Sequence, residues 1–280
     1  MIRIVTDSTC DMPAGWAEQY GITIIPVNIQ FGLESFQEGV SISAAEFYRR
    51  ISQSNSLPTT SQPAVGEIMR VYEGLRQAGH QVLSLHLTGK LSGTWQAATL
   101  AARQLADPDN ICVMDSATGS VGLGLMAREA ALLAAQQLPL ADIARRLEQR
   151  RSQISVLLML HDLRFARMSG RVGRVKELLT SLLQVKPIIG VEQGDLRLVE
   201  RVRGQKRGFE RMVARAAETL GNRPVHVAVA HAQSPDKAAH LLELARGRLN
   251  CADTFVTGLA LSIAVHFGPG TVGFVAYPAD

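Results

Sequence analysis

The chain has 280 residues, of which 46% are hydrophobic and 19% are charged. This composition excludes a disordered or fibrous protein, and the length predicts two domains with a sizeable buried core. The cysteines Cys10, Cys112 and Cys251 are far apart and form no CxxC pair, so the sequence indicates neither a disulfide scaffold nor a zinc site. Reduced thiols are typical of a cytoplasmic protein.

Neither a signal peptide nor a membrane span is expected. Asp7 interrupts the N-terminal apolar run before a signal sequence could form. Residues 254–279 contain no Asp, Glu, Lys or Arg, but Gly268-Pro269-Gly270 divides this run into pieces too short to cross a bilayer. We expect two buried strands around a tight turn here, in a protein of the cytoplasm.

Positive charge is concentrated in the middle of the chain. Residues 145–215 contain 17 Arg plus Lys against seven Asp plus Glu, a local charge of +10, whereas the remaining residues carry −6. Guanidinium groups favour bidentate contacts with phosphate or carboxylate. This section is therefore a candidate docking face for a phosphorylated or acidic partner, and the alternative is a solvated helix face.

The first half of the chain alternates short β-rich runs with helical periodicity. This rhythm of strand, helix and strand predicts a parallel sheet. Asp11 followed by Pro13 has the pattern of a helix start. The expected strands are 2–6, 22–31, 81–87 and 110–115, and the expected helices are 64–77, 95–106, 123–137 and 139–151.

The second half predicts a mixed sheet, because Gln193-Gly194-Asp195 joins two strand-like runs as a hairpin. The expected strands are 155–160, 187–192, 196–202, 225–230, 254–257 and 271–277, and the expected helices are 172–183, 204–220 and 234–248. The fold class is thus α/β with two domains. Residues 1–152 form a parallel-sheet α/β/α domain, and residues 153–280 form a mixed-sheet α/β domain.

Hydroxyl side chains recur in the loops that follow the predicted strands or precede helices. The loops are Thr6–Thr9, Thr59–Pro63, Thr88–Thr94 and Asp115–Ser120. Ligands of open parallel sheets bind at the carboxyl ends of the strands. Such residues are also ordinary helix caps and turn formers, but their recurrence in four loops favours a binding site.

Common catalytic motifs are absent from the sequence. Gly89-Lys90 lacks the upstream glycine of a P-loop, and Ser92 has no G-x-S-x-G context. Gly122-Leu-Gly124 opens a G-x-G-x-x-A match but lies seven residues beyond Asp115, so close helix packing explains it better than dinucleotide binding. Among the seven histidines, His266 precedes the expected turn, where its imidazole either presents an N–H to a ligand or fills a satisfied position in the core.

Several short motifs occur in a specific order along almost the whole chain, and in that order they resemble the DegV family. The motifs are Val5-Thr6-Asp7-Ser8, Pro58-Thr59-Thr60-Ser61-Gln62-Pro63, Leu91-Ser92-Gly93-Thr94, Ser169-Gly170-Arg171, Lys186-Pro187, Arg201-Val202-Arg203 and His266-Phe267-Gly268-Pro269-Gly270. Phe267 departs from the pattern, because the family usually has a small residue there.

The resemblance implies a protein that holds one long-chain fatty acid between its two domains and has no catalytic machinery of its own. It is similar to the fatty-acid-binding subunit of bacterial fatty acid kinase, which presents the acid to an ATP-dependent kinase for acyl-phosphate formation. Neither a metal nor a cofactor is expected beside the bound fatty acid. The family's carboxylate-binding positions match Thr60, Ser61, Ser92 and His266, and its partner-binding positions match Arg171 and Arg203.

Three alternatives stay open. The protein could carry or buffer fatty acid without a kinase. It could bind nucleic acid through the arginine-rich section, although no nucleic-acid-binding motif is present and we expect no nucleic-acid partner. It could also be a nucleotide-dependent enzyme that uses Gly122 and Gly124.

Overall fold

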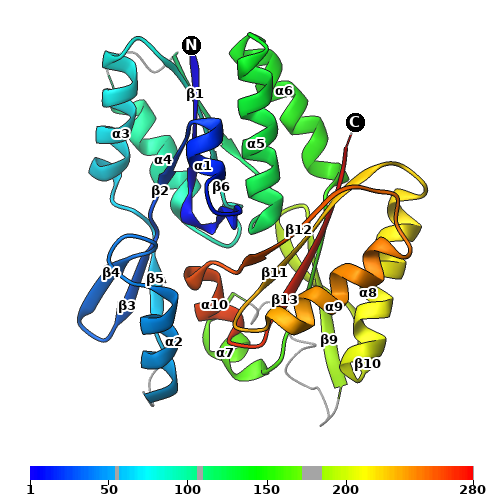
Figure 1. Cartoon of the computed structure of the whole chain (residues 1–280). Coiled ribbons are helices and arrows are strands. Elements are labelled where there is room, and N and C mark those ends of the chain that lie inside the picture. The colour runs from blue at the N-terminus through cyan, green and yellow to red at the C-terminus, as the bar shows by residue number, and fades with distance from the viewer. Residues whose placement is uncertain (54–56, 106–109, 172–184, 280) are drawn as a thin grey trace.

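The computed structural model describes residues 1–53, 57–105, 110–171 and 185–279. In these residues the chain forms a four-stranded parallel sheet, a three-stranded antiparallel sheet and a six-stranded mixed sheet (Figure 1). The expected α/β fold, with a parallel sheet followed by a mixed sheet, is confirmed. The boundary between domains 1–152 and 153–280 stays a prediction, and the expected helix at 172–183 lies outside the described residues.

The parallel sheet has the strand order β2-β1-β6-β7 and is covered by helices on both faces. Neighbouring residues of its second strand point to opposite faces, so Ile4 and Val5 belong to different core clusters. The strands are β1 (Ile2–Asp7), β2 (Ile22–Ile25), β6 (Gln81–His86) and β7 (Ile111–Asp115); α3 (Val65–Gln77) and α4 (Thr94–Arg103) cover one face, and α1 (Trp16–Tyr20), α5 (Val121–Ala135) and α6 (Leu140–Arg150) cover the other.

The small antiparallel sheet comes from a segment in which one long strand was expected at 22–31, and that expectation is wrong. The run breaks at Pro26, which has no N–H to donate to a strand ladder. The residues before Pro26 join the parallel sheet as β2, and those after it pair elsewhere. The sheet consists of β3 (Asn28–Phe31), β4 (Glu34–Gln37) and β5 (Thr59–Ser61), and α2 (Ala44–Gln53) packs beside it through the contact of Phe31 with Phe47.

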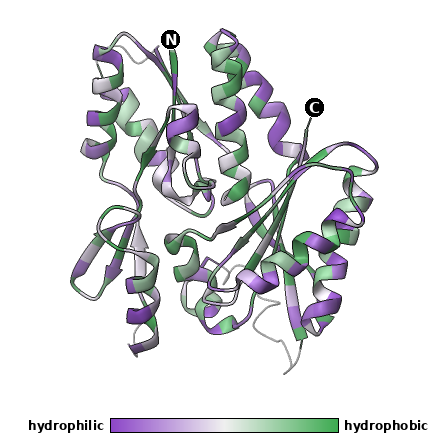
Figure 2. Ribbon diagram, in the orientation of Figure 1, coloured by the Kyte–Doolittle hydropathy of each residue, from purple (hydrophilic) through white to green (hydrophobic). Residues whose placement is uncertain are grey.

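The mixed sheet has the order β10-β9-β8-β13-β11-β12, in which β11 and β12 are parallel and the other neighbouring pairs are antiparallel. Its predicted hairpin is present, with Gln193 and Gly194 at positive φ in the turn. The amphipathic helices on its outer face alternate between hydrophobic and hydrophilic residues along the ribbon (Figure 2). The elements are β8 (Ser155–Met159), α7 (Leu163–Met168), β9 (Val185–Glu192), β10 (Asp195–Arg203), α8 (Gln205–Leu220), β11 (Val225–His231), α9 (Pro235–Arg246), β12 (Cys251–Gly258) and β13 (Val272–Pro278).

The C-terminal apolar run contains a helix, so the expectation of two buried strands around a tight turn is wrong. α10 (Leu261–Phe267) lies between the partly exposed edge strand β12 and the buried strand β13. Gly268, with a φ of 80°, ends this helix. A short run that is apolar on every side suits a buried helix as well as a buried strand, and periodicity alone cannot separate the two. No helix among the described residues is long and apolar enough to cross a membrane.

α5 lies between the two large sheets and shares one core cluster with both of them. Its side chains pack with Leu83 of the parallel sheet and with Val275 of the mixed sheet. A Cβ atom at Gly124 would lie 2.3 Å from the carbonyl oxygen of Cys10. The glycine is therefore explained by the close approach of α5 to the loop that follows β1.

We expect Gly124→Ala to lower the free energy of unfolding by about 1–3 kcal/mol, because the added methyl group meets backbone rather than a movable side chain. Chemical denaturation measures this change. Gly74→Ala is the matched control: Gly74 is exposed within α3 and meets no neighbouring element within 4 Å, so alanine should stabilise the helix by about 0.5–1 kcal/mol. Equal stability of Gly124→Ala and the wild type would contradict the packing argument.

Candidate functional site

A cavity lies between the carboxyl ends of the parallel strands and the mixed sheet, and α10 forms part of its wall. Ile263 and Phe267 of α10 contribute to its lining. An apolar interior with a small number of polar groups is typical of a small-molecule site. Both sheets supply further apolar residues: Leu87 and Leu91 after β6, Val156 and Leu158 on β8, Val191 on β9, and Leu196 on β10.

The predicted site residues separate into two groups. Thr60, Ser61, Ser92 and His266, which we call the polar cluster, all line this cavity, and so does Arg171. Arg203 does not line it; this residue ends β10 and is exposed. The fold thus brings together side chains that are 206 positions apart in the sequence.

His266 and Thr60 connect α10 to the small antiparallel sheet. The distance between Thr60 Oγ1 and His266 Nε2 is 3.0 Å. The other imidazole nitrogen, Nδ1, is buried and has no hydrogen-bond partner among the described residues. Burial, together with the charge of Arg171, lowers the pKa of His266 to about 4. The imidazole is therefore neutral at neutral pH and carries a single N–H.

Ser92 sits at the N-terminal end of α4, where backbone N–H groups point outward and favour an anion. Its Oγ lies 2.9 Å from Thr94 Oγ1 and accepts a hydrogen bond from Thr94 N at 3.3 Å. Between them, Gly93 lies against Gln62, because a Cβ at this position would be 2.4 Å from Gln62 Oε1. This contact brings the loop of Ser92 next to the strand end that carries Thr60 and Ser61.

Arg171 is exposed, and backbone oxygens hold its guanidinium group at the edge of the cavity. Nε donates to the carbonyl of Leu91 at 3.5 Å, and Nη1 donates to the carbonyl of Ser169 at 3.2 Å. Leu91 belongs to the same loop as Ser92. The charge of Arg171 is consequently placed beside the polar cluster without replacing its neutral donors.

Asp11 holds the N-terminal end of α10, and its expected role as a helix cap is wrong. α1 begins only at Trp16, and Asp11 has a φ of 42° and is 6% exposed. One carboxyl oxygen accepts a hydrogen bond from Ala260 N at 2.6 Å, and the other accepts one from Ser120 Oγ. Burial raises the pKa of Asp11 well above its usual value. A tertiary contact has therefore displaced the local helix-start pattern.

Glu38 makes a second contact with the same end of α10, which sequence reasoning missed. Its carboxyl group accepts hydrogen bonds from Ser262 N at 2.9 Å, from Ser262 Oγ at 2.6 Å and from Ser8 Oγ at 2.5 Å. Burial raises the pKa of Glu38, and these donors partly offset that effect. The only sequence signal was Ser8, which belongs to one of the hydroxyl-rich loops.

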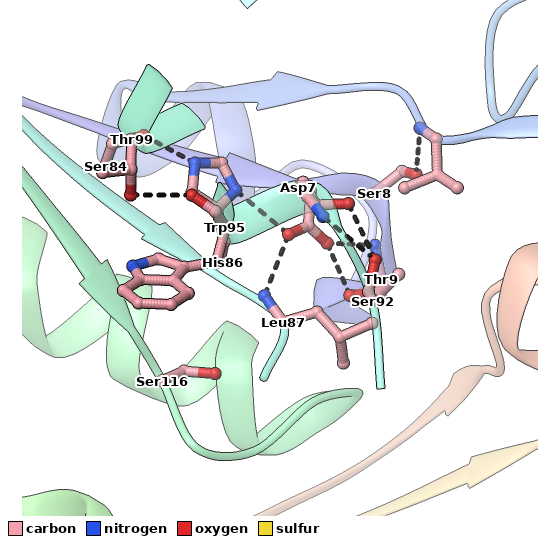
Figure 3. A network of polar contacts seen from close by, with 12 residues as sticks. Asp7, Ser8, Thr9, Ser84, His86, Leu87, Ser92, Trp95, Thr99 and Ser116 are labelled. Atoms are coloured by element: carbon pink, nitrogen blue, oxygen red, sulfur yellow. Dashed lines mark hydrogen bonds and ion pairs between the residues drawn. The ribbon is translucent and has the colours of Figure 1, made fainter. Parts of the chain in front are cut away.

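Asp7 organises two of the loops that reach the cavity (Figure 3). One carboxylate oxygen accepts hydrogen bonds from Thr9 N and Thr9 Oγ1 at 3.1 and 2.5 Å, and the other accepts one from Leu87 N at 3.0 Å. His86 Nδ1 lies 3.1 Å from that second oxygen. Burial opposes ionisation of Asp7, but the hydrogen bonds from His86, Thr9 and Leu87 outweigh it and lower its pKa.

Ser84, His86 and Asp7 have the connectivity of a Ser-His-Asp triad. Ser84 Oγ lies 2.7 Å from His86 Nε2, on the far side of the imidazole from Asp7. All three side chains are fully buried, and Tyr72 Oη donates to Ser84 Oγ at 2.7 Å. A nucleophile must be reached by substrate, so we assign these residues to support of the loops rather than to catalysis.

The described residues offer no metal site, because no group of His, Cys, Asp and Glu side chains among them could hold an ion. Cys10, Cys112 and Cys251 are free thiols. Burial raises the pKa of each thiol, which disfavours the reactive thiolate.

Comparison with known proteins identifies relatives over almost the whole length of the chain. The family model described as "Uncharacterised protein, DegV family" matches residues 1–279. A DegV domain-containing protein of Halalkalibacterium halodurans is 32% identical over 99% of this chain and 98% of its own. Protein DegV of Bacillus subtilis is 30% identical over 97% of each chain.

Solved structures of similar proteins share the fold. A DegV family protein from Thermus thermophilus, described by its fatty acid binding, has 32% identity and a TM-score of 0.92 over 99% of both chains. DegV of Bacillus subtilis, described as a fatty acid binding protein, has 30% identity and a TM-score of 0.89 over 99% of both. A DegV lipid binding protein from Thermotoga maritima has 27% identity and a TM-score of 0.90, covering 100% of this chain and 99% of its own. With the family match over residues 1–279, these likenesses show that the chain belongs to the DegV family.

Proposed function

We propose that this protein binds a long-chain fatty acid between its two sheets and presents the carboxylate to a partner kinase. The observation that carries the proposal is a single cavity whose apolar lining comes from both sheets and whose polar cluster joins Thr60, Ser92 and His266. Fatty acid binding by the relatives from Thermus thermophilus and Bacillus subtilis supports it.

The polar cluster suits a carboxylate held by neutral donors. Thr60, Ser61 and Ser92 supply hydroxyl groups, and His266 supplies an imidazole N–H. Hydrogen bonds to a charged acceptor are stronger than bonds between neutral groups, so three or four such donors orient the head group. The apolar lining accounts for the acyl chain, whose burial supplies most of the affinity.

An accessible carboxylate oxygen is what the second half of the proposal requires. In acyl-phosphate formation a carboxylate oxygen attacks the terminal phosphorus of ATP held by the kinase, and the bond to the bridging oxygen breaks as ADP leaves. An arginine clamp would engage both carboxylate oxygens, whereas hydroxyl donors leave one available. We assign contact with the kinase to the exposed side chains of Arg171 and Arg203.

The remaining alternatives predict different behaviour. A fatty-acid carrier without a kinase would use the same cavity, and addition of a kinase would yield no acyl phosphate. Nucleic-acid binding is less well supported, because several arginines of the basic section already pair with carboxylates, such as Arg164 with Asp162 and Arg211 with Glu200. Binding to a phosphate backbone would weaken steeply with salt, whereas an enclosed fatty acid would stay bound.

We expect Thr60→Val and Ser92→Ala each to weaken fatty-acid binding about ten- to a hundredfold. Each variant removes a hydrogen bond to a charged group, which is worth about 1.5–3 kcal/mol. Calorimetric titration with a fatty acid measures the affinity. Thr59→Val is the matched control, because Thr59 is exposed on the same strand and bonds to Gln30 instead. Unchanged affinity in both folded variants would remove these residues from the site.

Fatty-acid binding should raise the pKa of His266, because a nearby carboxylate favours the protonated imidazole. In the ligand-free protein the pKa of about 4 lies below the usual 6.5, so the unfolded state takes up a proton first. The contribution of His266 to stability is therefore lost as pH falls from about 6.5 to 4. NMR titration of the imidazole nitrogens with and without fatty acid tests both statements. An unchanged pKa on binding would place the carboxylate elsewhere.

Arg171→Ala should reduce acyl-phosphate formation by the kinase while leaving fatty-acid affinity nearly unchanged, because the exposed guanidinium lies outside the apolar lining. Trapping of the acyl phosphate with hydroxylamine measures the coupling. Arg70→Ala, an exposed arginine on α3, is the control for loss of one surface charge. Loss of lipid binding in Arg171→Ala would refute this division of roles.

A further inference from the structure

A second, solvent-open pocket adjoins the cavity beside the polar cluster. It is formed by residues 89–93 of the loop after β6, by Gln96 in the first turn of α4, and by Ser169, Gly170 and Arg171 after α7. Leu91, Ser92, Gly93 and Arg171 line both this pocket and the cavity. The two spaces therefore meet at the side chains that we assign to the fatty-acid head group.

The pocket is positively charged, unlike the polar cluster. Lys90 and Arg171 both line it, and neither makes an ion pair with a carboxylate of the described residues. The nearest acidic side chain, Asp115, is already used, because its two oxygens accept hydrogen bonds from Gly89 N and Ala117 N at 3.1 and 2.8 Å. The two cations are thus available to an anion that enters the pocket.

The loop that carries Lys90 is held in place from both sides. Gln96 Nε2 donates to the carbonyl of Gly89 at 3.1 Å, and Lys90 N donates to Thr88 Oγ1 at 3.4 Å. Arg171 is anchored to the same loop through the carbonyl of Leu91. The N-terminal end of α4 faces the same pocket through Gly93 and Gln96, and its exposed N–H groups add to the positive potential.

We propose that this pocket holds the phosphoryl group of an acyl phosphate whose acyl chain occupies the cavity. The inference rests on the proposed function. A carboxylate in the polar cluster already has neutral donors, so two unpaired cations one step further out exceed what the fatty acid needs. A phosphoryl group attached to a carboxylate oxygen extends outward from the cluster and carries the additional negative charge that Lys90 and Arg171 match.

The test compares two ligands of equal chain length. One is a saturated fatty acid, and the other is a 2-oxoalkylphosphonate, in which a CH₂ group replaces the labile bridging oxygen of the acyl phosphate. Lys90→Gln should weaken phosphonate binding about tenfold and leave fatty-acid binding unchanged, because only the phosphonate reaches Lys90. Lys237→Gln is the matched control, since Lys237 lies on α9 outside both spaces and should change neither affinity.

The outcomes separate this inference from the proposed function. Fatty-acid binding with phosphonate binding that is absent, or that is insensitive to Lys90→Gln, would overturn the phosphoryl site alone. Failure of both ligands to bind the wild type would overturn the proposed function as well. Inorganic phosphate provides the last arm: if it displaces the phosphonate's head group, seen as loss of the Lys90 effect at high phosphate but not at equal ionic strength of chloride, the pocket recognises phosphate itself.

Discussion

The contact between α10 and the loops of the N-terminal half is the constraint on which the site depends. The backbone N–H groups of Ala260 and Ser262 donate to the buried carboxyl groups of Asp11 and Glu38. Because burial raises the pKa of both acids, ionised carboxylates at this interface cost the folded state free energy unless donors surround them. Amide and hydroxyl donors offset that cost, and they do so only when α10 sits in this one position.

That position determines what the cavity looks like. α10 carries Ile263 and Phe267 into the apolar lining and places His266 within hydrogen-bond distance of Thr60. On the opposite wall, Asp7 fixes Thr9 and Leu87 through backbone and side-chain bonds. Buried acids thus set the geometry of both walls without lining the cavity themselves, which leaves neutral groups to meet the ligand.

Charge is arranged in layers around the proposed head-group position. The interior is apolar, the polar cluster is neutral because His266 is kept unprotonated, and the cations Lys90 and Arg171 stand outside it. This order suits a ligand that changes from a carboxylate to a more strongly charged acyl phosphate at its outer end. It also explains why arginine is excluded from direct clamping of the acid, since a strong ion pair would hold the oxygen that has to react.

Much of the secondary structure follows from local pattern alone, and the sequence order of the motifs was enough to indicate the family. The parallel sheet, the hairpin around Gly194 and the covering helices are recognisable because alternation and helical spacing act over a few residues. The resemblance also selected Thr60, Ser92 and His266, which the fold places around one cavity. Only the tertiary structure decided that Pro26 divides a strand between two sheets, that α10 is a helix, and that Asp11 and Glu38 serve its far end. These outcomes depend on contacts between residues hundreds of positions apart, whose burial energy overrides a local preference that is worth less.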